Sequence, residues 1–117
     1  MAAESGNVSQ ESILMGLRQS GSVEGAATTK LIKRGKVKIN LVLTDPRKGG
    51  AAGRAPFGSD KVYLSLDKLH SQTSAAGVAA HEIKHVLQKQ TPKTYRQVHE
   101  IDAYQWQRAV DPNFNFV

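Results

Sequence analysis

The chain contains no cysteine. This absence excludes disulfide frameworks, thiol nucleophiles and every zinc site built from cysteine. A metal ion would therefore have to be bound by histidine, aspartate or glutamate.

Long apolar runs are also missing. The longest is the small-residue run at residues 75–80, which is far too short to span a membrane. Residues 1–12 carry two glutamates and no apolar core, unlike a Sec-type signal peptide. We therefore expect a soluble protein with no N-terminal signal peptide and no membrane partner, and its compartment stays open.

Acidic residues are scarce in one segment. Residues 30–54 hold eight of the sixteen Lys and Arg residues, with Asp45 as the only acid. Such a segment can attract phosphate or an acidic protein. However, only 6% of the chain is aromatic, and residues 30–54 contain no aromatic residue; the next one along the chain is Phe57. A stacking surface for nucleic acid is therefore missing. A solvated basic face is the ordinary interpretation, and nucleic acid is not the favoured partner.

The pattern of apolar residues predicts an α+β fold with N-terminal helices, a small mainly antiparallel sheet between residues 36 and 66, and two C-terminal helices. With 117 residues, one domain at 11–117 follows a polar tail at 1–10. Residues 45–60, rich in glycine and proline, are expected to form a loop, and Pro92 separates the last two helices. Helices are predicted at 11–19, 22–34, 74–90 and 94–110, and strands at 37–43 and 62–66.

The third of these helices carries the motif H-E-x-x-H at residues 81–85. His81 and His85 are four residues apart, so both imidazoles lie on one helix face and can bind one metal ion. Glu82 can then reach a water molecule at that metal and act as general base. Two imidazoles and a carboxylate suit zinc with one open position, which is typical of a catalytic site. The apolar stripe predicted to face the core from this helix contains Ala76, Ala80, Ile83 and Leu87.

The third ligand is expected from the last helix. Pro92 lies about midway between His85 and Glu100, so an antiparallel helical hairpin brings these two side chains to the same height. The adjacent His99 is the competing ligand, since it is also a residue type that binds zinc. Both alternatives stay open on spacing alone.

The motif and the helix that follows resemble a known family. H-E-x-x-H followed by E-x-x-A at residues 100–103 resembles the gluzincin pattern in a minimal form. More narrowly, A-A-H-E (79–82), H-V-L-Q (85–88) and residues 100–106 resemble small metallopeptidase domains at the C-termini of bacterial Rhs-type polymorphic toxins. The similar region covers residues 61–112.

This resemblance implies a zincin-like fold and a zinc-dependent endopeptidase, with His81, His85 and Glu100 as ligands and Glu82 as general base. It favours Glu100 over His99. It also implies a toxin or effector secreted as part of a larger polypeptide and acting in a target cell, with a protein or peptide substrate and a cognate immunity protein. The alternative is a basic binding module for nucleic acid or an acidic protein partner, with a structural or vestigial metal site.

Several further side chains are candidates for supporting roles. Larger gluzincins carry an acidic residue that orients a zinc histidine, and this chain has Ala103 and Tyr104 instead, so Asp102 or Asp111 would have to replace it. The strand at 62–66 resembles the edge strand along which zincins bind substrate backbones. Trp106, Val98 and Ala109 are expected in the core. The candidates for hydrogen bonding to the oxyanion are Tyr95, Tyr104, His99 and Arg96. The hairpin places Tyr104 opposite His81.

Overall fold

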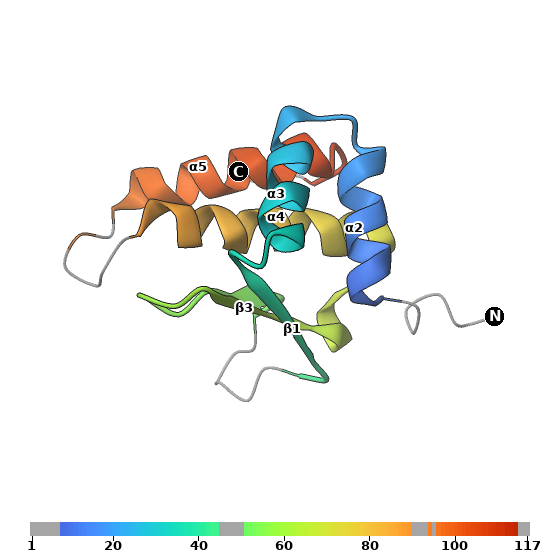
Figure 1. Ribbon diagram of the computed structural model, residues 1–117, viewed down its shortest axis with the longest axis horizontal. Coiled ribbons are helices and arrows are strands. Elements are labelled where there is room, and N and C mark those ends of the chain that lie inside the picture. Colours follow the sequence, from blue (N-terminus) through green and yellow to red (C-terminus); the bar gives the residue numbers. More distant parts are fainter. Residues whose placement is uncertain (1–7, 45–50, 90–93, 95, 115–117) are drawn as a thin grey trace.

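The structure is a computed structural model that describes residues 8–44, 51–89, 94 and 96–114. This part of the chain forms an α+β fold of four α-helices, one short 3-10 helix and a three-stranded sheet (Figure 1). The elements are α2 (Gln10–Gln19), α3 (Val23–Lys33), β1 (Lys38–Val42), β2 (Gly53–Arg54), β3 (Lys61–Ser65), η1 (Leu66–Lys68), α4 (Gln72–Gln88) and α5 (Gln97–Val110).

Helix α4 occupies the centre of the molecule. In Figure 1 it lies between the sheet and α5, while α2 and α3 cross in front of it. Every residue from 75 to 83 is buried, as expected for a helix that is covered on all sides. Small side chains allow this close packing: a Cβ atom added at Gly16 of α2 would lie only 2.8 Å from the Cβ atom of Ala76.

The sheet is mixed, with the strand order β1-β3-β2. Strand β1 pairs with β3 in parallel, placing Ile39 beside Val62, whereas β2 pairs with β3 in antiparallel fashion. The prediction of a mainly antiparallel sheet was therefore wrong. The segment between β1 and β3 is long enough to bring the chain back to the starting end of β1, so that these two strands can pair in parallel. The antiparallel partner of β3 is β2, which has only two residues.

The position of β3 corrects a second expectation. This strand, predicted at 62–66 as the edge strand of a substrate site, is the middle strand of the sheet. The strand beside the candidate site is β2, which lies in the region expected to be a loop. Residues 45–50, in the same region, and Pro92 lie outside the described residues.

Serine side chains begin three of the helices close to the predicted positions. The hydroxyls of Ser9, Ser22 and Ser71 accept hydrogen bonds from backbone N–H groups in the first turns of α2, α3 and α4. The fourth predicted helix begins later than expected, at Gln97. Val8, in the segment expected to be a polar tail, belongs to the core.

Two apolar side chains expected to face the core are exposed instead. Val98 is 59% exposed in the first turn of α5, and Leu87 is 39% exposed in the last turn of α4. Leu43, at the end of the strand predicted at 37–43, is 79% exposed because it follows the last paired residue of β1. Trp106 is partly buried against the core, with the Lys84 ammonium group 4.9 Å from its ring centre. No helix in the described part of the chain is both long and apolar enough to cross a membrane.

Candidate metal centre

Three side chains from two helices meet at one point. His81 and His85 of α4 both direct Nε2 at the same carboxylate oxygen of Glu100 on α5, at 2.7 Å and 3.2 Å. One ligand atom from each residue lies within 4.8 Å of the others, so the group could hold a metal ion. Glu100, one of the two alternatives left by the spacing, is the residue that completes the group.

The hydrogen bonds of Gln88 determine the state of the His85 ring. The Gln88 side-chain amide donates through Nε2 to the backbone carbonyl of His99 at 2.9 Å. Its Oε1 must therefore be the atom that lies 2.9 Å from Nδ1 of His85, and this oxygen accepts a hydrogen bond from the N–H group at Nδ1. In the neutral ring, Nε2 of His85 then carries the lone pair, which is the form that binds a metal.

This tautomer creates a conflict that a cation resolves. With Nδ1 protonated, the neutral His85 ring presents an acceptor to the Glu100 carboxylate, which is also an acceptor, across only 3.2 Å. A proton on Nε2 or a metal ion between the two groups removes the repulsion. Ligand atoms around a tetrahedral zinc ion with bonds of about 2.0–2.1 Å lie roughly 3.3 Å apart, close to this spacing. The donor set therefore fits a small divalent metal ion.

His81 is held deep in the fold. It is 7% exposed, and burial lowers its pKa despite the opposing effect of the Glu100 carboxylate, so the neutral ring is favoured. The Tyr104 ring packs edge-on against it, with the ring centres 4.7 Å apart. Its Nδ1 is buried without a well-formed hydrogen bond among the described residues, although the Gln107 side chain acts on its pKa from nearby.

Glu82 is buried beside the three ligands. It is 8% exposed, and burial, followed by the charge of Glu100, raises its pKa to about 8. Strand β2 packs directly onto it: a Cβ atom at Gly53 would lie 2.9 Å from Cγ of Glu82 and 2.8 Å from the Val78 side chain. Glycine at this position thus lets β2 approach α4 and confine the Glu82 carboxyl group.

The three ligands and Glu82 line one open cleft of about 560 Å³. Its walls come from β2 with the turn after it, from α4 and from α5, and Tyr104 lies on the α5 side. Burial and the charges of Glu100 and Glu82 raise the pKa of Tyr104, so its phenol keeps its proton near neutral pH. Tyr104 can therefore donate a hydrogen bond within the cleft, as expected of a candidate oxyanion donor.

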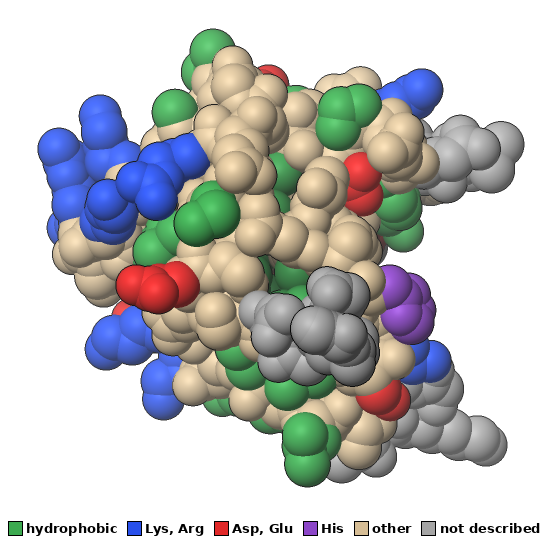
Figure 2. Space-filling model, turned by 90° about the vertical axis from the view of Figure 1, so that its right-hand side faces the viewer, with side chains coloured by type: hydrophobic (Ala, Val, Ile, Leu, Met, Phe, Trp, Pro, Cys, Tyr) green, Lys and Arg blue, Asp and Glu red, His purple; other side chains and the backbone are tan. Residues whose placement is uncertain are grey.

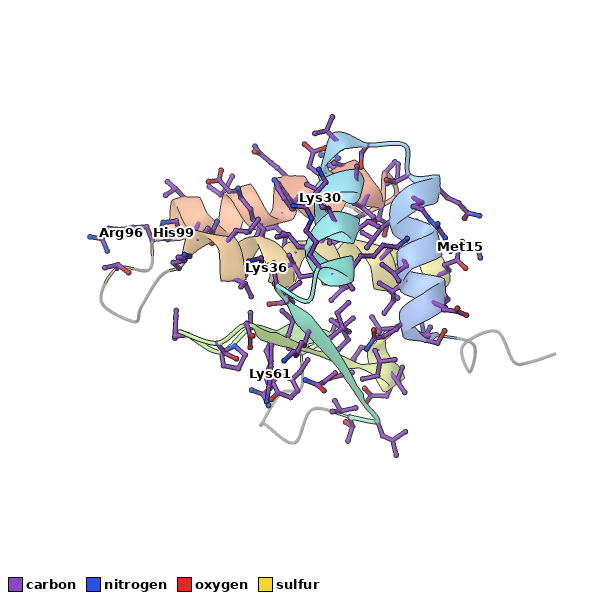
Figure 3. All side chains as sticks on the ribbon, viewed as in Figure 1. Met15, Lys30, Lys36, Lys61, Arg96 and His99 are labelled. Atoms are coloured by element: carbon purple, nitrogen blue, oxygen red, sulfur yellow. The ribbon has the colours of Figure 1, made fainter. Side chains whose placement is uncertain are left out.

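The other predicted supporting residues lie elsewhere. Nδ1 of His99 accepts a hydrogen bond from the backbone N–H of Arg96 at 3.0 Å, so this ring closes the first turn of α5. Figure 3 labels both residues at this end of the helix. Asp102 is exposed, and Tyr95 lies outside the described residues. Asp111 is buried at the end of α5, where its side chain accepts from the backbone N–H of Asn113.

Sequence reasoning missed two residues that shape the site, Gln88 and Gly53. A search for an acidic partner of the histidines passed over Gln88, although it lies one helical turn after His85 and its amide oxygen can serve the same purpose. Gly53 had no readable signal, because its role depends on how closely β2 approaches α4.

Comparison with known proteins returned no match: no protein-family model, curated protein or solved structure matches this chain.

Proposed function

We propose that this protein is a zinc-dependent endopeptidase with a zincin-like site. The observation that carries the proposal is the convergence of two imidazole nitrogens on one Glu100 oxygen, with Gln88 setting His85 in its metal-binding tautomer. Three protein ligands leave one position for water, the pattern of a catalytic zinc site. When bound, zinc would supply Lewis-acid chemistry by lowering the pKa of water and polarising a carbonyl group.

The chain's own residues supply the remaining chemistry. Glu82, confined between α4 and β2, takes the proton from the attacking water and returns it to the leaving amine. Tyr104, on the α5 side of the cleft, donates a hydrogen bond to the oxygen on which negative charge develops. The open cleft admits an extended peptide, which agrees with an endopeptidase.

Exchange of Glu82 for glutamine tests the proposal. Glu82→Gln keeps the shape of the side chain and all three ligands but removes the base, so zinc should stay bound while peptide hydrolysis falls by about 100-fold or more. Zinc content and cleavage of an unfolded protein substrate are measured on the same samples. Full activity in this variant would show that Glu82 is not the base, and loss of zinc would show that its carboxylate serves the metal.

The resemblance to toxin domains extends the proposal to a biological role. We propose that the activity belongs to a bacterial effector that a cognate immunity protein neutralises. Expression of the wild-type chain should then inhibit growth, and expression of Glu82→Gln at equal level should not. Equal growth inhibition by the two proteins would favour the alternative, a basic binding module whose effect needs no hydrolysis.

A further inference from the structure

A second cavity opens next to the metal cleft. Its volume is about 580 Å³, and it lies between the end of α3, the turn that joins β2 to β3, and the last turn of α4. Its apolar lining includes Leu31, Val37, Phe57, Val86 and Leu87. Two of these apolar side chains are exposed to solvent: Phe57 is 50% exposed and Leu87 is 39% exposed.

The rim of this cavity is strongly basic. Lys30, Arg34, Lys36 and Lys89 line it, and Asp60 is the only acid among the described residues of its lining. None of the four cations forms an ion pair with a residue that the structure describes. Lys30 and Lys36 lie on the same side of the molecule in Figure 3, and Figure 2 shows Lys and Arg side chains gathered along one side of the surface.

The two cavities are adjacent and share one wall. His85, Ala55, Pro56 and Phe57 line both of them, so the ring of a metal ligand separates the cleft from the apolar cavity. A polypeptide that leaves the cleft over this shared wall therefore reaches the basic rim within a few residues of the bond placed at the metal centre, because an extended chain advances about 3.3 Å per residue.

We propose that this cavity is a specificity site for an acidic, apolar-anchored stretch of the polypeptide that passes through the metal cleft. An aliphatic side chain of that stretch enters the apolar cavity, and flanking Asp or Glu residues pair with the rim. Charge complementarity selects this occupant, because the described residues around the apolar floor include four cations and one acid. The inference rests on the proposed function, which brings a polypeptide to the cleft, and adds the class of sequence that is recognised.

Peptide binding to zinc-loaded Glu82→Gln protein tests this inference without hydrolysis. The probes are three fluorescein-labelled peptides of equal length: two leucines flanked by glutamates, the same leucines flanked by lysines, and two serines flanked by glutamates. Fluorescence anisotropy should show the first peptide binding about tenfold more tightly than either of the others. The advantage over the lysine peptide should shrink as salt is raised towards about 0.5 M, because exposed charges are screened.

Matched variants locate the site. Lys30→Glu combined with Lys36→Glu should weaken the acidic peptide by about tenfold, and the neutral pair Lys30→Gln with Lys36→Gln should have a smaller effect of the same sign. Leu87→Ser should remove the advantage of leucine over serine. The control is Lys68→Glu on η1, which makes a single charge reversal outside the cavity and should leave the affinity nearly unchanged.

Equal affinity for the three peptides would overturn the inference, as would a single-stranded oligonucleotide that binds more tightly than the acidic peptide and displaces it. Cleavage by the zinc-loaded wild type separates this test from the test of the proposed function. Selective binding of the acidic peptide with no cleavage of any peptide contradicts the peptidase proposal alone. Cleavage of acidic and basic peptides at equal rates contradicts the specificity site alone.

Discussion

The two turns of α4 that carry the histidines differ in how they hold them. Around His81 the helix is buried on every side, and the ring is fixed by Tyr104 and by close packing. Around His85 the helix is only partly covered, at the mouth of both cavities, and the ring is fixed by the hydrogen bond from its Nδ1 to Gln88. One turn uses packing and the other uses a directional bond to point the same kind of atom at Glu100.

This difference has a cause in the surroundings of each residue. Burial keeps His81 neutral by lowering its pKa, so its metal-binding form needs no strong partner. The His85 side chain is as little exposed as that of His81, at 10% against 9%. What differs is its hydrogen bond to Gln88, which selects the tautomer of the ring. Removal of the side-chain partner of His85 should therefore lower zinc affinity more than removal of the side-chain partner of His81.

The largest effect is expected at the residue that serves both turns. Glu100→Ala removes the oxygen on which both imidazoles converge, so zinc affinity should fall by more than about 100-fold. His99→Ala is the matched control on the preceding residue. It should leave zinc affinity nearly unchanged, because His99 bonds the backbone of Arg96. Zinc titration against a competing chelator measures both. Loss of the metal in His99→Ala with retention in Glu100→Ala would exclude the gluzincin-type ligand set.

An intermediate effect should separate the two turns. Gln88→Leu removes the partner of His85 Nδ1, and zinc affinity should fall by about 10-fold to 100-fold. Gln107→Leu should cost less, because Nδ1 of His81 has no well-formed hydrogen bond to lose. The same chelator competition ranks the two variants. Equal losses, or a larger loss in Gln107→Leu, would show that His81 also depends on a directional bond.

The last effect concerns pH and the stability of the metal-free protein. Burial raises the pKa of Glu82 from 4.5 to about 8 in the fold, so the folded state holds this proton more tightly than the unfolded state. Its contribution to stability is complete below pH 4.5 and is lost as pH rises towards about 8. Glu82→Gln cannot titrate there, and the lowered pKa of His81 acts in both proteins.

Urea unfolding in the presence of a chelator measures this difference. Between pH 5 and pH 8 the free energy of unfolding of the wild type should fall relative to Glu82→Gln, by roughly 1–4 kcal/mol. Added zinc should reduce the difference, because a cation in the centre favours the ionised carboxylate. Parallel pH profiles without metal would show that the Glu82 carboxyl group reaches water.

Local signals in the sequence predicted much of the fold. Apolar periodicity placed the starts of α2, α3 and α4 within about two residues, because the pattern repeats within each helix. The motif spacing predicted that His81 and His85 share a helix face, and the hairpin brought Glu100 to them. Each of these inferences depends on geometry inside one helix or between two consecutive helices.

The features that were missed depend on contacts distant in sequence. The parallel pairing of β1 with β3 and the short strand β2 depend on contacts between residues nine or more positions apart in the chain. Leu87 and Val98 follow the apolar pattern of their helices, but they lie in a last and a first turn that no described helix or strand covers. Periodicity indicates which face a residue occupies and not whether anything packs against that face.

Zinc binding by the wild-type chain tests the central claim most directly. Protein purified without added metal is analysed for its metal content, and the chelated protein is then titrated with zinc while X-ray absorption reports the ligands. We expect one zinc ion per chain, bound by two imidazole nitrogens and oxygen ligands that include one carboxylate and water, together with a higher unfolding temperature than in the chelated protein. Metal content near zero that added zinc does not restore, or coordination by four protein side chains, would contradict the claim.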